Sequence, residues 1–171
     1  MLARCKLRHR IEGDSVSMFR FGKEQMVFDI AGVKVGGDVG ENPTVMIGSI
    51  FYKGDKSVKD EAKGIFDQEA AGALIHKVEE MSDRTGLPAM LDVICTNPES
   101  AEKYLSFAAE TTEMPLLIDA VSDEAAIRGL EVAKELGIEE RTIYNSISPD
   151  TKESIYRKIR EVNLKSAIIL T

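Results

Sequence analysis

Cysteine is scarce in this sequence, which has only Cys5 and Cys95 among its 171 residues. Neither lies in a C-x-x-C pair, so we exclude a disulfide-stapled scaffold and a cysteine-based zinc site. The same scarcity fits a protein of the reducing cytoplasm. Long apolar runs are also missing, since the longest are about five residues and a membrane helix needs about 20. We therefore expect no membrane-spanning segment.

Basic residues are outnumbered, because 22 Lys and Arg against 29 Asp and Glu give a net charge of −7. Nucleic-acid binding draws most of its affinity from phosphate neutralisation, so we expect no nucleic-acid partner. A short basic stretch at the start of the chain, residues 4–10, has no apolar core after it and is not a signal peptide. We interpret residues 1–17 as a disordered tail or the product of an upstream start codon, with Met18 as the more natural first residue.

A dinucleotide-binding glycine motif is missing as well. Residues 36–40 read Gly-Gly-Asp-Val-Gly, but they precede the first strand of the repeating pattern described below. They therefore cannot direct a helix N-terminus at a phosphate group, and a Rossmann domain loses most of its support.

The sequence does contain an alternation of short apolar runs and one-sided helical patterns. A small β-hairpin is predicted from residues 27–30 and 33–35, which a two-residue turn with glycine connects. Five runs of strand length then begin near Thr44, Ala89, Pro115, Thr142 and Ser166.

Helical patterns lie between these runs, and caps and glycines mark their ends. We expect four helices. The first runs from Asp67 to Gly86, and the second begins at Asn97 with Pro98. The third runs from Ser122 to Gly137, and the fourth begins at Ser148-Pro149. The first should bury Ala71, Leu74, Ile75, Val78 and Met81 on one stripe.

Apolar strands that alternate with such helices indicate βαβ units and a parallel sheet. A repeat near 25 residues favours a barrel with short loops over a doubly wound sheet. A complete eight-unit barrel needs about 250 residues. The predicted fold class is therefore α/β: a TIM-type (β/α)8 barrel truncated after about five β/α units, with an N-terminal β-hairpin, over residues 18–171.

Hydrogen-bonding side chains follow the apolar part of every predicted strand: Ser49, Asp92, Asp119, Asn145 and Thr171. In a parallel barrel these positions gather around one mouth, where active sites lie. Two carboxylates and a carboxamide suit a flat heterocycle with amino and oxo groups. Each residue could instead open a loop or cap a helix, although Ser122 and Ser148 are nearer caps than Asp119 and Asn145.

Three other features carry weaker functional signals. His76 has no second ligand one helical turn away, so we interpret it as a surface histidine and expect no metal site. Cys95 follows a strand without a histidine nearby to activate it, so we expect a small semi-buried residue. The charged segment 53–63 is long for a barrel loop, and we expect it to be either solvated or a contact surface for a partner.

The sequence resembles the H subunit of tetrahydromethanopterin S-methyltransferase over almost the whole chain after Met18. The residues that carry this resemblance are 18–21, 28–37, 43–52, 63–67, 90–93, 117–119 and 143–147. Several of these stretches have five or more residues in order, which makes the likeness more specific than any single motif. It extends over about the first half of a full-length family member.

The resemblance implies a pterin-binding barrel that passes a methyl group from methyl-tetrahydromethanopterin to cob(I)alamin held by a partner, the corrinoid-binding A subunit. The complex then methylates coenzyme M and moves sodium across the membrane of methanogens. This implies a cytoplasmic location, peripheral on the cytoplasmic side of a membrane complex, and we also expect a homo-oligomer.

In pterin-binding barrels the aspartate that ends strand three and the asparagine that ends strand four contact the pterin. By position these are Asp119 and Asn145 here, with Asp92 and Ser49 as further candidates. Because Co(I) is itself the nucleophile, the protein needs no nucleophile of its own. Its tasks are to orient the methyl group and to improve the pterin nitrogen as a leaving group. Related barrels draw part of that help from strands six and seven, so the catalytic residues stay unassigned.

Two alternatives remain open from the sequence. The chain could be a non-catalytic half-barrel that dimerises or docks on a partner. It could also be a relative in the same family that serves bacterial demethylation, with tetrahydrofolate as the methyl acceptor.

Overall fold

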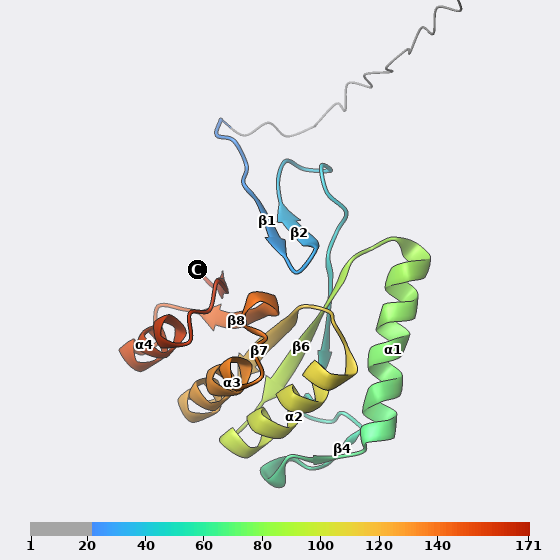
Figure 1. Ribbon diagram of the computed structural model, residues 1–171, viewed down its shortest axis with the longest axis vertical. Helices are drawn as coiled ribbons and strands as arrows, with labels where there is room; N and C mark the ends of the chain where they lie inside the picture. The colour runs from blue at the N-terminus through green and yellow to red at the C-terminus, as the bar shows by residue number, and fades with distance from the viewer. Residues whose placement is uncertain (1–21) are drawn as a thin grey trace, which may run out of the picture.

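The computed structural model describes residues 22–171, which form a five-stranded sheet, four α-helices and two small hairpins (Figure 1). The expected tail at residues 1–17 lies outside the described residues. The elements are β1 (Val27–Ile30), β2 (Val33–Gly36), β3 (Met46–Ile50), β4 (Val58–Asp60), η1 (Glu61–Lys63), β5 (Ile65–Phe66), α1 (Gln68–Thr85), β6 (Ala89–Cys95), α2 (Pro98–Thr111), β7 (Leu116–Ala120), α3 (Asp123–Glu135), η2 (Glu139–Arg141), β8 (Thr142–Ile147), α4 (Glu153–Glu161) and β9 (Ser166–Ile169).

The central sheet has the strand order β3-β6-β7-β8-β9, and every neighbouring pair is parallel. All four helices contribute to one core with the alternate residues of β6, Leu91, Val93 and Cys95. The helices therefore lie on one face of the sheet, as the strand and helix pattern predicts for βαβ units (Figure 1). The expected parallel sheet and N-terminal hairpin are confirmed.

The opposite face of the sheet, called here the inner face, packs against the β1–β2 hairpin. Met90, Leu117 and Ile143 form a small second core, with Ile30 and Val33 of the hairpin against it. The hairpin covers the end of the sheet where the strands begin (Figure 1). This architecture fits part of a barrel, but within residues 22–171 the sheet does not close, and β3 and β9 remain its two edges.

The predicted helix starts are confirmed for three of the four helices, because local side chains determine them. Asp67, Asn97 and Ser122 each accept a hydrogen bond from the backbone N–H of the third residue after them. The prediction for α4 is wrong, because this helix begins at Glu153. Ser148 instead starts a turn, in which its N–H donates to Thr151 Oγ1 at 2.8 Å.

Part of the expected apolar stripe on α1 is exposed. Ala71 and Ile75 are buried as predicted, but Leu74 is 49% exposed and Met81 is 38% exposed. These two side chains border a groove beside the free edge of β3, together with Met46 and other residues, and the groove has a volume of about 490 Å³. The sheet and the neighbouring helices therefore bury only part of the apolar stripe of α1 within the described residues.

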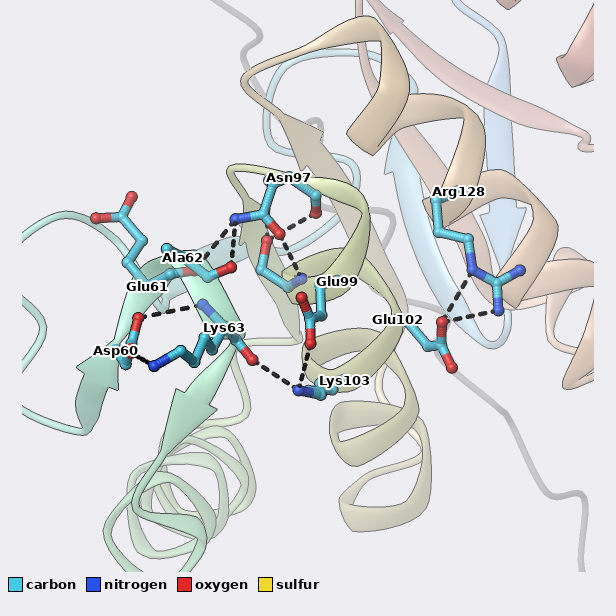
Figure 2. A network of polar contacts seen from close by, with 10 residues as sticks. Asp60, Glu61, Ala62, Lys63, Asn97, Glu99, Glu102, Lys103 and Arg128 are labelled. Carbon is cyan, nitrogen blue, oxygen red and sulfur yellow. Dashed lines mark hydrogen bonds and ion pairs between the residues drawn. The ribbon is translucent and has the colours of Figure 1, made fainter.

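Segment 53–63, expected to be either solvated or a contact surface for a partner, is mostly exposed but contains folded elements. It contains β4, η1 and the approach to β5, and two polar side chains at its base, Asp55 and Ser57, are buried. Figure 2 shows how the start of α2 holds η1. Asn97 Nδ2 donates to the Glu61 carbonyl at 3.2 Å, and Lys103 Nζ donates to the Lys63 carbonyl at 2.7 Å.

Candidate functional site

Four of the predicted site residues lie on the inner face. Each follows, by two residues, an apolar residue that lines the groove under the hairpin: Ile47, Met90, Leu117 and Ile143. Side chains two residues apart in a strand share a face, so Ser49, Asp92, Asp119 and Asn145 point to the same side. The strand register pairs Ser49 with Asp92, and Asp119 with Asn145. Four of the five residues that the sequence suggests therefore share one face, and their role in a site stays a prediction.

Asp92 is the centre of a hydrogen-bond network on this face. Ser49 Oγ donates to Asp92 Oδ2 at 2.8 Å, and Asn145 Nδ2 donates to Asp92 Oδ1 at 3.1 Å. Asp92 is 6% exposed, and a buried carboxylate is tolerated when its oxygens accept hydrogen bonds. The network therefore joins three strands, β3, β6 and β8, through one side chain.

The bond between Asp92 and Asn145 also reports the shape of the sheet. Strand β7 lies between β6 and β8, and two strand spacings in a flat sheet amount to about 9–10 Å. A 3.1 Å contact across the intervening strand requires the side chains to converge above β7. The inner face is therefore concave at the level of the site.

Asp119 lies on β7, between the partners of that bond, and is half-buried. Burial raises the pKa of its carboxyl, and the nearby charge of Asp92 raises that pKa further. Within residues 22–171, no hydrogen bond contributes to this shift. Of the two aspartates on the inner face, Asp119 is therefore the one whose carboxyl oxygens are not used in a hydrogen bond among the described residues.

Three residues differ from their predicted placement. The sequence suggests that Asp92 and Asn145 end their strands, but β6 continues three residues further to Cys95 and β8 two residues further to Ile147. Strand β6 continues because Val93 and Cys95 are both buried in the core on the helix side of the sheet. Thr171 lies beyond the last residue of β9, is exposed, and does not join the inner-face network in the described chain.

Cys95 is more deeply buried than expected, with no exposed surface. It faces the helix-side core, and its thiol donates to the Val93 carbonyl at 3.5 Å. Burial raises the pKa of the thiol, and the charges of Asp119 and Asp92 raise it further. The side chain is therefore poorly suited to act as a nucleophile.

Asp55 is a structural residue that the sequence prediction missed. Its carboxylate accepts hydrogen bonds from the Phe51 N–H and from the N–H and hydroxyl of Ser57, each at 2.8 Å. These bonds hold the turn just after β3, where Phe51 has a φ of +64°. An Asp two residues before a Ser is a common turn pattern, so the sequence did not indicate the structural role of Asp55. Asp55 fixes the strand end that carries Ser49.

The described residues show neither a metal centre nor a membrane span. Between residues 22 and 171, no three His, Cys, Asp or Glu side chains gather in a way that could hold a metal ion. His76 is exposed and contacts Glu79 at 3.0 Å. No helix in the same part of the chain combines the length and apolarity that crossing a bilayer requires.

A parallel sheet with helices on one face and a polar row on its concave face defines the class of this protein. It is an α/β protein with a parallel five-stranded sheet and four helices, an architecture that fits part of a barrel. A family model described as the tetrahydromethanopterin S-methyltransferase MtrH subunit matches residues 23–171. The chain belongs to this family.

The relatives carry matching names. The chain is 47% identical over 153 residues to the H subunit of tetrahydromethanopterin S-methyltransferase from Methanothermobacter marburgensis, an alignment that covers 90% of this chain and 49% of the relative. It is 46% identical over 149 residues to the protein of the same name from Methanopyrus kandleri, covering 87% of this chain and 46% of the relative. It is also 41% identical over 153 residues to the H subunit of a putative mtx methyltransferase from Methanosarcina barkeri, covering 90% and 49%. The chain spans about half the length of the curated relatives it matches.

Proposed function

We propose that this chain supplies the pterin-binding part of a methyltransferase that moves the methyl group of methyl-tetrahydromethanopterin to the cob(I)alamin of a corrinoid subunit. The observation that carries the proposal is the family match over residues 23–171. The polar row on the concave inner face supports it, because a pterin ring needs hydrogen-bonding groups placed over an apolar surface.

Asp119 and Asn145 are the residues that we assign to direct contact with the pterin. They are register partners on neighbouring strands, so their side chains can reach the same edge of a flat ring. Burial and the charge of Asp92 raise the pKa of Asp119, so this carboxyl keeps a proton to higher pH than an exposed aspartate. Such a group can hydrogen-bond to a ring nitrogen either as a donor or as an acceptor.

The partner's cob(I)alamin, when bound, supplies the nucleophile for the methyl group. The tasks left to this chain are to hold the pterin and to orient its methyl group toward the acceptor. These tasks require no nucleophile from this chain. The position of Cys95 agrees with that, because its side chain points into the core on the opposite face of the sheet. We place the chain in a complex with the corrinoid-binding A subunit and the other subunits that methylate coenzyme M, on the cytoplasmic side of the membrane.

The proposal is tested by the binding of tetrahydromethanopterin, measured by calorimetry. The protein is this chain fused to the part of the Methanothermobacter marburgensis relative that it does not match. Asp119→Ala and Asn145→Ala should each weaken binding by about 1–3 kcal/mol, the cost of leaving a polar partner unpaired. Asp150→Ala is the control, because Asp150 is exposed at the end of the turn after β8 and should leave affinity unchanged.

Unchanged affinity in both site variants would remove these two residues from the pterin site. Tetrahydrofolate titrated into the same protein discriminates the folate-linked alternative, since tighter binding of tetrahydrofolate than of tetrahydromethanopterin would favour that function.

A second candidate function is a non-catalytic half-barrel that self-associates or docks. The edge strands of the sheet favour it, because Met46 and Ile47 on β3 and Ile169 on β9 are large apolar residues that are at least half exposed. Such edges recruit other strands. Sedimentation of the chain alone should then show a homo-oligomer, whereas a stable monomer would exclude self-association.

A further inference from the structure

The hydrogen bonds of the inner face divide its four polar residues into two groups. Asp92 uses one oxygen for Ser49 and the other for Asn145, and it is almost fully buried. Asp119 has neither of these partners. A carboxylate whose two oxygens already accept bonds inside the protein is poorly placed to bind a ligand as well, so Asp92 and Asp119 have different tasks.

The bond to Asp92 determines which way the carboxamide of Asn145 points. A carboxamide has one oxygen acceptor and one NH2 donor group at opposite corners of a planar unit. Because Asn145 Nδ2 donates to Asp92 Oδ1 at 3.1 Å, the Asn145 oxygen is directed away from Asp92. The reversed orientation would bring the amide oxygen against a carboxylate oxygen, which offers no hydrogen bond and is electrostatically unfavourable.

Ser49 reinforces this arrangement from the other side. Its hydroxyl has a single hydrogen, and that hydrogen is donated to Asp92 Oδ2 at 2.8 Å. The strand register keeps Ser49 directly opposite Asp92, so the contact is built into the pairing of β3 and β6.

We propose that Asp92 is a positioning residue, held by Ser49, that fixes the carboxamide of Asn145 with its oxygen toward the ligand. The inference rests on the proposed function for the identity of the ligand, and it adds that Asn145 recognises an N–H donor on that ligand. A heterocycle that presents only acceptors at this edge would be rejected, because an unpaired buried carboxamide oxygen is costly.

The orientation is tested first without any ligand, by NMR of the isotope-labelled full chain. The side-chain NH2 resonances of Asn145 should shift in Asp92→Asn at neutral pH, because the oxygen that accepts from Asn145 Nδ2 then belongs to an amide instead of a carboxyl group. The control Asp150→Asn should leave them in place. Asn145 resonances that do not respond to Asp92→Asn would overturn the proposal, whatever the ligand is.

Ligand recognition is tested with tetrahydromethanopterin and an exchange of the two side chains, in the fusion described above. Asp92→Asn should weaken binding by about tenfold, because an asparagine accepts either orientation of Asn145. Asn145→Asp should also weaken binding and make it stronger at low pH, since two facing carboxylates must then share a proton. The double variant Asp92→Asn/Asn145→Asp restores one donor and one acceptor and still directs an oxygen at the ligand.

The double variant should therefore recover most of the lost affinity. If Asn145 instead contacted the ligand through its N–H, the double variant would stay as weak as Asn145→Asp, and the proposal would be wrong. Urea unfolding of the same variants separates this result from a change in stability. Ser49→Ala, which removes only one donor from Asp92, should fold normally and lose about two- to threefold in affinity. Wild-type protein that binds no pterin would refute the proposed function, and the NMR result alone would then decide the role of Asp92.

Discussion

At the scale of single residues, Asp119 connects the site with the stability of the fold. Burial and the charge of Asp92 raise the pKa of this carboxyl above its ordinary value. A carboxyl with a higher pKa in the folded than in the unfolded chain binds more protons when folded. Its contribution to stability is therefore present below the unfolded pKa, near 3.9, and is lost as the pH rises through the folded pKa.

Asp119→Asn should therefore increase the free energy of unfolding at pH 7, because it removes a half-buried charge beside Asp92. The gain should disappear near pH 3, where the wild-type carboxyl is protonated in both states. Urea unfolding of the full chain at both pH values measures this difference. Asp150→Asn, at an exposed position, should show no such pH dependence. A loss of stability at pH 7 in Asp119→Asn would mean that the carboxylate has a stabilising partner.

The sequence predicts which polar residues share the inner face better than it predicts their contacts. Ser49, Asp92, Asp119 and Asn145 share a face because side chains alternate along a strand, and that rule is local. The hydrogen bond from Asn145 to Asp92 crosses β7 and depends on the curvature of the whole sheet. No pattern in the sequence encodes that curvature, so the pairing of these two residues could not be predicted.

At the scale of elements, the helix starts that depend on local hydrogen bonds were predictable, and one other helix start was not. The caps of α1, α2 and α3 are local hydrogen bonds and were predictable. The start of α4 was not, because Ser148-Pro149 suits both a helix start and the turn that Thr151 closes. The β4–β5 hairpin was hidden by its charged residues, since its contacts with α2 come from residues 35 or more positions away in the chain.

Gly64 tests whether this hairpin is held rigidly on α2. It has a φ of +57°, and a Cβ atom there would lie 3.0 Å from Ser100 Cα and 3.2 Å from the Glu99 carbonyl oxygen. Gly64→Ala should cost about 1–2 kcal/mol for the left-handed backbone and more for the contact with the backbone of α2. Urea unfolding measures this cost.

Gly137→Ala is the matched control, because Gly137 has a φ of +67° and a Cβ atom there would have no neighbour within 4 Å among the described residues. Gly137→Ala should lose only the stability that the left-handed backbone costs, about 1–2 kcal/mol. Equal losses in the two variants would show that the hairpin moves aside easily and does not pack firmly on α2.

At the scale of the whole molecule, the described chain is a curved sheet with two free edges. The groove of about 490 Å³ beside β3 and the groove of about 280 Å³ under the hairpin are both lined mainly by apolar residues. Exposed apolar edges and grooves of this type mark surfaces that other polypeptide covers. The sequence predicted the parallel strands, because strands and helices alternate with a regular period. It could not predict the exposure of Leu74 and Met81, because that depends on what lies beside β3.

The proposal that this chain forms the pterin side of a methyl-transfer site is tested by the rate at which methyl-tetrahydromethanopterin converts cob(I)alamin to methylcobalamin, followed by absorbance. We expect transfer by this chain fused to the unmatched part of the Methanothermobacter marburgensis relative, a strongly reduced rate with Asp119→Ala, and no transfer by the chain alone. A folded fusion that transfers no methyl group, or that transfers it equally well with Asp119→Ala, would show that Asp119 and the inner face do not form this site.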